Sequence, residues 1–210
     1  MSKEIFVFGA SGHAKVVLDV IEREQRYQVA FLLDDAAAGS EKVWFGYRVA
    51  GGREVLASSK PPEVSSAVVA IGQNLARLEV ADWLTDHGYA LISTVHPSAV
   101  ISRGVTIAEG SVLMAGCVIN SDSRIGANVI INTGATVDHD CEIADGVHIA
   151  PGSNLCGGVI VGRGTLIGAG STVIPGISIG SNVVVGAGST VVKDILDGEK
   201  VAGTPAQSLR

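Results

Sequence analysis

A strict six-residue repeat runs through the second half of this 210-residue chain. Every sixth residue from Val95 to Val191 is aliphatic, at all seventeen positions. Three residues before each of these, from Gly104 to Gly188, stands Gly, Asn or Asp, the types that best tolerate a positive φ. The residue two before each aliphatic is small or β-branched, as at Ala99, Ser111, Cys117, Ala135, Ser153, Ser171 and Ser189. Because residues two apart on a strand share a face, each hexad predicts a corner, a short strand and a corner, with two side chains pointing inward.

A six-residue repeat is typical of a parallel β-helix. Over residues 95–192 it resembles the repeat of the hexapeptide-repeat acyltransferases, and this resemblance implies a left-handed β-helix of triangular section with three hexads in each coil. The handedness rests on the resemblance alone, since crossovers between parallel strands are otherwise right-handed. About five coils would then stack into a prism roughly 25 Å tall. Its weakly charged faces favour packing against copies of the same chain.

The first 94 residues follow a different pattern, in which short apolar runs alternate with amphipathic stretches. The expected elements are strands at 5–8, 29–33 and 67–71 and helices at 14–26 and 75–87. Such alternation predicts a small Rossmann-like parallel α/β domain. We therefore expect an α/β domain at 1–94, a β-helix at 95–192 and a tail at 193–210, with ligands bound beyond the carboxyl ends of the strands.

Composition excludes several classes of protein. The net charge is −6, with 15 basic residues against 21 acidic ones, which argues against a nucleic-acid partner. Three cysteines without paired spacing indicate a reducing compartment, and the apolar stretch before Gly9 is too short for a signal peptide, so we expect a cytoplasmic protein. Residues 164–192 are uncharged and long enough to span a bilayer, but their glycines and strict repeat favour the β-helix.

Two polar turns of the first domain suggest a nucleotide. The turn Gly9–His13 combines two glycines with a helix N-terminus, and His13 or Lys15 would add positive charge for a phosphate. It lacks the third glycine of G-x-G-x-x-G, so an ordinary strand-to-helix connection is the alternative. Asp34 and Asp35 end the second strand, where a Rossmann-like unit places the acid that binds ribose or base. The small size of the unit disfavours a dinucleotide.

Two histidines of the β-helix stand at outward positions. His139 lies at a corner next to Asp140, so its ring should project from the prism. His148 lies between the inward residues Val147 and Ile149. The two histidines are half a coil apart, on opposite sides of a filled prism. A site that uses both must therefore lie between subunits.

Joined in this order, the two halves resemble the bacterial nucleotide-sugar N-acetyltransferases and the related sialic-acid O-acetyltransferase-like proteins. The resemblance rests on Gly9-Ala-Ser-Gly-His-Ala-Lys15, Asp34-Asp35, Ile71-Gly-Gln-Asn74, Asn132-Thr-Gly, Asp138-His-Asp-Cys141, His148-Ile-Ala-Pro-Gly and Gly203-Thr-Pro-Ala206. It departs from the family at Asp140, where members often have Glu, and at Thr204, where Val is commoner.

The resemblance implies where the substrates bind. The nucleotide of a sugar would bind the small domain through Gly9, Ser11, Gly12, His13, Lys15, Asp34, Asp35, Gly72 and Asn74. Acetyl-CoA would lie along the β-helix between neighbouring subunits of a homotrimer, at Asn132, His148, Gly157, Gly158, Ala169 and Ala187.

Acetyl transfer from a thioester to an amine needs a group that takes a proton near pH 7, and neutral imidazole is suited to this. We predict His139 as the general base. Asp140 or Asp138 would hold the ring tautomer, and the resemblance favours Asp140. Backbone amides of the stretch 157–158 would stabilise the oxyanion.

Other chemistries are disfavoured. Cys117 and Cys141 occupy inward positions, and Cys156 lies at a corner without an adjacent base, which argues against a cysteine acyl-enzyme. No cluster of His, Cys and acidic residues has the spacing of metal ligands, so we expect no metal.

The predicted function is acetyl-CoA-dependent N-acetylation of a nucleotide-linked amino sugar, of the UDP- or GDP-4-amino-4,6-dideoxyhexose type. Two alternatives stay open. One is an O-acetyltransferase that acts on a sialic acid or exopolysaccharide sugar with the same histidine. The other is a non-catalytic trimer that only binds a nucleotide sugar.

Overall fold

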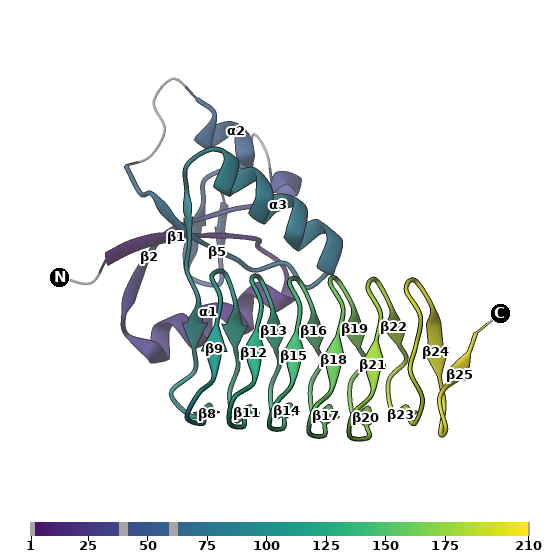
Figure 1. The fold of residues 1–210 in the computed structure, drawn as a ribbon. Helices are drawn as coiled ribbons and strands as arrows, with labels where there is room; N and C mark the ends of the chain where they lie inside the picture. The colour runs from purple at the N-terminus through teal and green to yellow at the C-terminus, as the bar shows by residue number, and fades with distance from the viewer. Residues whose placement is uncertain (1–2, 38–41, 59–62, 210) are drawn as a thin grey trace.

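The computed structural model describes residues 3–37, 42–58 and 63–209. A small α/β unit lies against one end of a prism of stacked coils (Figure 1). Each coil contributes three short strands, so the prism has three faces and three edges. The two predicted architectures are confirmed, and the α/β unit leads directly into the first coil.

The α/β unit is a six-stranded sheet in the order β3-β4-β2-β1-β5-β6, parallel except where β3 pairs with β4. Its elements are β1 (Lys3–Phe8), α1 (Gly12–Glu24), β2 (Tyr27–Leu33), η1 (Asp35–Ala37), β3 (Lys42–Trp44), β4 (Tyr47–Val49), α2 (Arg53–Leu56), β5 (Ser66–Val69), α3 (Asn74–Asp86) and β6 (Ala90–Leu91). The three expected strands and two expected helices are present. The short elements β3, β4, α2 and β6 were not predicted, because elements of two to four residues carry no readable periodicity.

The prism is built from two-residue strands that pair in parallel with the next coil, as in the register Ile131↔Ile149. Face one contains β7 (Thr94–Val95), β10 (Val112–Leu113), β13 (Ile130–Ile131), β16 (His148–Ile149), β19 (Leu166–Ile167), β22 (Val184–Val185) and β24 (Lys200–Ala202). Face two contains β8 (Val100–Ile101), β11 (Val118–Ile119), β14 (Thr136–Val137), β17 (Asn154–Leu155), β20 (Thr172–Val173) and β23 (Thr190–Val191). Face three contains β9 (Thr106–Ile107), β12 (Arg124–Ile125), β15 (Glu142–Ile143), β18 (Ile160–Val161) and β21 (Ser178–Ile179).

The corners have the backbone conformation that the repeat requires. All fifteen predicted corner residues from Gly104 to Gly188 have a positive φ, including the four that are not glycine. Among these, φ is 58° at Asp140 and 56° at Asn128. Asn and Asp tolerate this region better than other residues with a Cβ, which explains why they alone replace glycine here.

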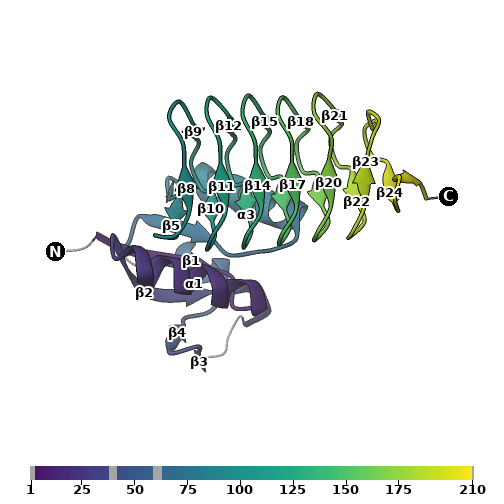
Figure 2. The same ribbon diagram turned by 90° about the horizontal axis from the view of Figure 1, so that it is seen from below.

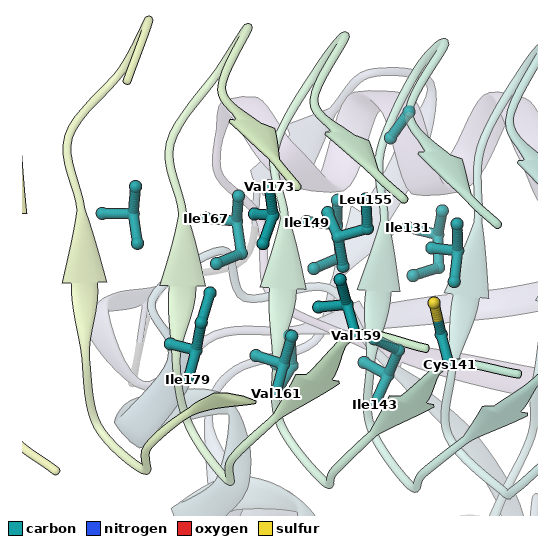
Figure 3. Packing of buried hydrophobic residues seen from close by; sticks show 14 of the residues in the cluster. Ile131, Cys141, Ile143, Ile149, Leu155, Val159, Val161, Ile167, Val173 and Ile179 are labelled. Atoms are coloured by element: carbon teal, nitrogen blue, oxygen red, sulfur yellow. The ribbon is translucent and has the colours of Figure 1, made fainter. Parts of the chain in front are cut away.

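Inward aliphatic side chains fill the prism from end to end. Ile131, Ile149 and Ile167 are fully buried and stack along the inside of face one (Figure 3). Small inward residues lie next to the corners of the coils. Among them, the hydroxyls of Ser111 and Ser153 donate to backbone carbonyls 2.8 Å away. Every buried polar group named here is therefore paired, and no channel runs through the prism.

The segment predicted as a tail, 193–210, contains two further strands within its described residues. β24 continues face one, and β25 (Gln207–Ser208) pairs with it in antiparallel orientation. In the described part of the chain, no helix has the length and apolar character needed to cross a bilayer.

The α/β unit covers face one of the first coils. Apolar residues of α1, such as Val17 and Ile21, form one cluster with Val112 and Ile130 of face one. Figure 2 shows α1 beside these coils, with the strands of the small sheet beyond it. This packing brings the turns of the α/β unit close to His148 on β16.

Candidate active site

The three edges of the prism carry different residues. The α3 edge, between faces three and one, includes residues 128, 146 and 164 and is covered by α3. The Asn132 edge, between faces one and two, includes residues 132–133, 150–151, 169 and 187. The His139 edge, between faces two and three, includes residues 138–140 and 157–158. The predicted site residues of the prism lie on or beside two of these edges, the Asn132 edge and the His139 edge.

His139 projects into solvent from its edge, with 59% of its side chain exposed. Its Nδ1 lies 2.7 Å from Oδ2 of Asp140. Asp138 instead accepts the backbone N–H of His139 at 2.9 Å and an amide N–H of Asn120 at 2.8 Å. The structure therefore places Asp140 on the imidazole and Asp138 on the backbone beside it.

This arrangement sets the proton affinity of the ring. The hydrogen bond that His139 donates to Asp140, followed by the charge of Asp138, raises the pKa of His139 above its ordinary value. Hydrogen bonds from Asn120 and from the His139 backbone lower the pKa of Asp138, so that carboxylate stays ionised. With Nδ1–H donating to Asp140, the neutral ring presents an unprotonated Nε2 to solvent.

A glycine in the next coil makes room for the His139 ring. A Cβ at Gly157 would lie 2.6 Å from both Cε1 and Nε2 of His139. The Gly158 amide donates to the His139 carbonyl at 2.9 Å and is committed to the coil. Among the described residues, the Gly157 amide makes no hydrogen bond. Of the two predicted oxyanion donors, only the Gly157 N–H is therefore available to a ligand.

His148 has contrasting surroundings. Its Nε2 lies 3.0 Å from the amide nitrogen of Asn132, and its ring centroid lies 6.2 Å from that of His13. Burial and the charge of Arg77 lower the pKa of His13 and of His148 to about 4, whereas a backbone hydrogen bond from His148 to Gly72 acts in the opposite direction. Both imidazoles are therefore neutral at pH 7.

Within one chain, the predicted acetyl-CoA residues fall into two groups. Asn132, Ala169 and Ala187 lie on the Asn132 edge, with His148 beside Asn132. Gly157 and Gly158 lie on the His139 edge. The filled prism separates the two groups, as expected for His139 and His148.

A pocket of about 290 Å³ opens at the carboxyl ends of the strands in the α/β unit. It is lined by Phe8, Gly9, Ser11, Asp34, Asp35, Arg53, Ile71, Ala76, Glu79 and Val80. Asp34 connects two of its turns, because its carboxylate accepts the amides of Ala10 at 2.7 Å and Ala36 at 2.9 Å. Ser11 at the start of α1 makes no capping hydrogen bond with its side chain, so the helix N-terminus stays open to an anion.

Two charged residues of this pocket, Arg53 and Glu79, were not predicted from the sequence. Arg53 donates to Asp35 at 2.8 Å and to Glu79 at 3.1 Å, and so crosses one wall of the pocket. Arg53 begins the four-residue α2, and Glu79 lies in the middle of α3. Neither position has a sequence signal, because only the fold brings the two segments together.

Other predicted nucleotide residues lie outside the pocket lining. Gly12 is the first residue of α1, and a Cβ there would meet no atom within 4 Å. The Lys15 ammonium lies over the rings of Trp44 and Phe45, at 5.5 and 5.7 Å. Gly9 does line the pocket, but its φ of 125° and close approach to Ala70 also give it a role in strand packing.

His13, Gly72 and Asn74 lie at the junction of the two units. His13 packs against His148, and a Cβ at Gly72 would be in ordinary contact with the His13 ring. The Asn74 amide donates to the carbonyls of Gly164 at 2.9 Å and Thr165 at 3.1 Å. These residues connect the pocket to face one of the prism. Across the described ranges, no three His, Cys, Asp or Glu side chains gather as a metal site would require.

Family models match both halves of the chain. Residues 4–84 match the PglD N-terminal domain. Residues 122–157 match the bacterial transferase hexapeptide (six repeats), and residues 158–193 match the hexapeptide repeat of succinyl-transferase.

Solved structures match almost the whole chain. Perosamine N-acetyltransferase from Caulobacter crescentus, in complex with CoA and GDP-perosamine, is 39% identical with a TM-score of 0.94, and the match covers 99% of this chain and 97% of that one. The structures of that enzyme include histidine variants with both ligands bound. The acetyltransferase domain of PglB from Neisseria gonorrhoeae, in complex with acetyl coenzyme A, is 38% identical with a TM-score of 0.91 and full coverage of both chains.

A protein named UDP-N-acetylbacillosamine N-acetyltransferase, from Bacillus subtilis, is 38% identical over 123 residues. This match covers 54% of the present chain and 52% of the Bacillus protein. The chain therefore matches about half the length of that relative.

Proposed function

This chain belongs to the hexapeptide transferase superfamily, in the group of nucleotide-sugar N-acetyltransferases, and on that premise we propose that it transfers the acetyl group of acetyl-CoA to the amino group of a nucleotide-linked 4-amino-4,6-dideoxyhexose. One observation carries the proposal. The exposed His139 ring is held by Asp140 at Nδ1 and leaves Nε2 free to take a proton.

The proposed reaction is direct attack on the thioester. The sugar amine attacks the acetyl carbonyl carbon while Nε2 of His139 removes a proton from the nitrogen. Asp140 stabilises the imidazolium that forms. In this proposal the Gly157 amide donates to the oxyanion of the tetrahedral intermediate. When the intermediate collapses, the C–S bond breaks, and the CoA sulfur leaves as the thiol with the proton from His139.

We assign the acceptor to the α/β domain at 1–94. Ser11 and the open start of α1 would bind the diphosphate, and the end of the pocket lined by Asp35, Arg53 and Glu79 would receive the nucleoside. Support comes from relatives with different nucleotides. The Caulobacter structures hold GDP-perosamine, whereas the Bacillus relative is named for a UDP-linked sugar. The proposal therefore covers both UDP and GDP.

We further propose that the active unit is a homotrimer of parallel prisms. His139 on one edge and His148 beside another are separated by the filled prism, so one chain cannot bring them to one acetyl group. A neighbour's His148 and Asn132 would complete the acetyl-CoA site at His139. Exposed apolar side chains on the faces support association, as at Val100, Ile160 and Val184.

The test is CoA release from acetyl-CoA with a panel of UDP- and GDP-linked 4-amino sugars. We expect thiol release that depends on a sugar amine, with an N-acetyl product identified by mass spectrometry. Hydroxyl sugars of the same nucleotides serve as matched controls. Turnover on the hydroxyl sugars alone would contradict N-acetylation. Binding of the nucleotide sugars without any CoA release would contradict catalysis.

A further inference from the structure

Arg77 is fully buried at the α3 edge, with 1% of its surface exposed. Its hydrogen bonds go to neutral oxygens, namely the carbonyls of Asn128 at 2.9 Å, Gly146 at 2.8 Å, Ile71 at 3.1 Å, Gly72 at 3.3 Å and Val147 at 3.4 Å, and Asn74 Oδ1 at 3.0 Å. In the described ranges, no carboxylate lies within ion-pair distance of it. A buried cation without a counter-ion is costly to fold, so its retention calls for a role beyond packing.

One side of the guanidinium hydrogen-bonds to equivalent backbone positions in successive coils of the prism. Asn128 and Gly146 occupy equivalent corners of successive coils, and Arg77 binds the carbonyl of each. Asn74 continues the series by donating to the Gly164 carbonyl of the next coil. Leu78 fills the space above Gly146, where a Cβ would lie 2.5 Å from its Cδ1. The start of α3 is therefore fixed on three consecutive coils.

The other side of the guanidinium holds the turn between β5 and α3. Nη1 donates to the carbonyls of Ile71 and Gly72. Ile71 lines the nucleotide pocket, and a Cβ at Gly72 would lie 3.6 Å from the His13 ring, whose centroid is 6.2 Å from that of His148. Arg77 thus stands between the nucleotide pocket and the histidine beside the Asn132 edge.

The charge of Arg77 acts on the same histidines. The titratable groups that face His148 are His13 from the start of α1 and Arg77 from α3. The neighbouring outward residues on face one, Ile130 and Leu166, are apolar. Burial lowers the pKa of Arg77 itself only to about 10, so it remains a cation at pH 7.

We propose that Arg77 is a positioning residue of the acetyl-transfer site, which holds the turn at Gly72, positions His148 through the adjacent His13 ring, and couples the nucleotide pocket to the acetyl-CoA edge. Its charge also opposes protonation of His148, which keeps Nε2 of that ring an acceptor for the Asn132 amide. The inference rests on the proposed function in one respect, that His148 contacts acetyl-CoA.

Two variants separate the charge of Arg77 from its geometry. Arg77→Lys keeps the cation but loses the planar set of donors, whereas Arg77→Met keeps much of the volume and loses the cation. The first readout is the titration of imidazole Cε1–H signals by NMR in the absence of substrates, with His148→Gln used to assign the His148 signal. Arg23→Met, an exposed arginine of α1, is the control.

We expect the His148 signal of the wild type and of Arg77→Lys to stay that of the neutral ring down to pH 5. In Arg77→Met it should titrate at a higher pH than in the wild type. If Arg77→Met does not fold, Arg77→Lys and its kinetics carry the test. This readout needs no substrate, so it stands even if the proposed function fails.

The second readout is steady-state kinetics. Both variants should raise the KM for acetyl-CoA by about tenfold or more, because a misplaced His148 weakens a contact while His139 is untouched, and kcat should fall less. A purely structural role predicts a lower melting temperature with the wild-type KM and the wild-type His148 titration. That result, in folded Arg77→Lys or Arg77→Met, would overturn the proposal.

Discussion

The two outward histidines of the prism occupy opposite electrostatic environments. His139 is exposed and bound to a carboxylate, which raises its pKa, whereas His148 is enclosed between His13, Asn132 and Arg77, and its pKa falls to about 4. The same side chain on the same repeat is thus prepared for two tasks. His139 can accept a proton near neutral pH, while His148 stays a neutral hydrogen-bonding group.

The largest expected effect is the loss of the general base. His139→Ala should lower kcat by about 10²-fold or more, the usual contribution of a positioned base, with little change in acetyl-CoA affinity. Steady-state kinetics over pH 6–9 with a nucleotide-linked 4-amino sugar measures this effect. Near-normal turnover across that range would show that His139 is not the general base, and the two histidines would then not differ in catalytic role as argued above.

Mixing His139→Ala with His148→Ala, under conditions where each is nearly inactive alone, tests whether the two histidines serve one site. If a trimer interface brings His148 of one chain beside His139 of the next, then subunit exchange between His139→Ala and His148→Ala should restore some sites that have both histidines. Activity before and after verified exchange measures this. Each variant exchanged with itself is the control. No recovery of activity, or full activity in a demonstrated monomer, would show that the two histidines do not serve one shared site.

A smaller effect should follow from filling the space beneath the His139 ring. Gly157→Ala places a methyl group 2.6 Å from Nε2 in the present geometry, so the ring must move. We expect kcat to fall by about tenfold with the fold intact, since a small misplacement of a reacting group is costly. Thermal unfolding distinguishes this from a folding defect. Unchanged kcat would show that the ring has another productive orientation.

The smallest expected effect concerns pH. Because a raised pKa keeps His139 protonated to a higher pH, kcat/KM should fall as pH drops through that pKa. Asp138→Asn removes a negative charge that favours the imidazolium. The acidic limb of the pH profile, where kcat/KM falls, should therefore move to lower pH. Asp19→Asn, in the exposed pair with Arg23, is the control and should leave the limb in place. A limb that does not move in Asp138→Asn would contradict the electrostatic account of His139.

The β-helix was predictable almost residue by residue because its stability is local and repetitive. The corner residue of each hexad needs a positive φ, and the inward aliphatic needs burial, so the period alone determines which side chains face outward. His139 was identifiable for this reason, and its partner Asp140 is adjacent in the sequence. In the α/β domain, the main strands and helices were predictable, but the short hairpin β3–β4 and helix α2 were not.

The sequence by itself determined the coil, the outward positions of His139 and His148, and the separation of the two by half a coil. Only the tertiary structure decided that α3 covers one edge of the prism, that Arg53 spans Asp35 and Glu79, and that Arg77 lies between the nucleotide pocket and His148. The physical reason is that these contacts join segments far apart in the chain. Their geometry depends on how the two units dock, and no periodicity in either unit encodes that docking.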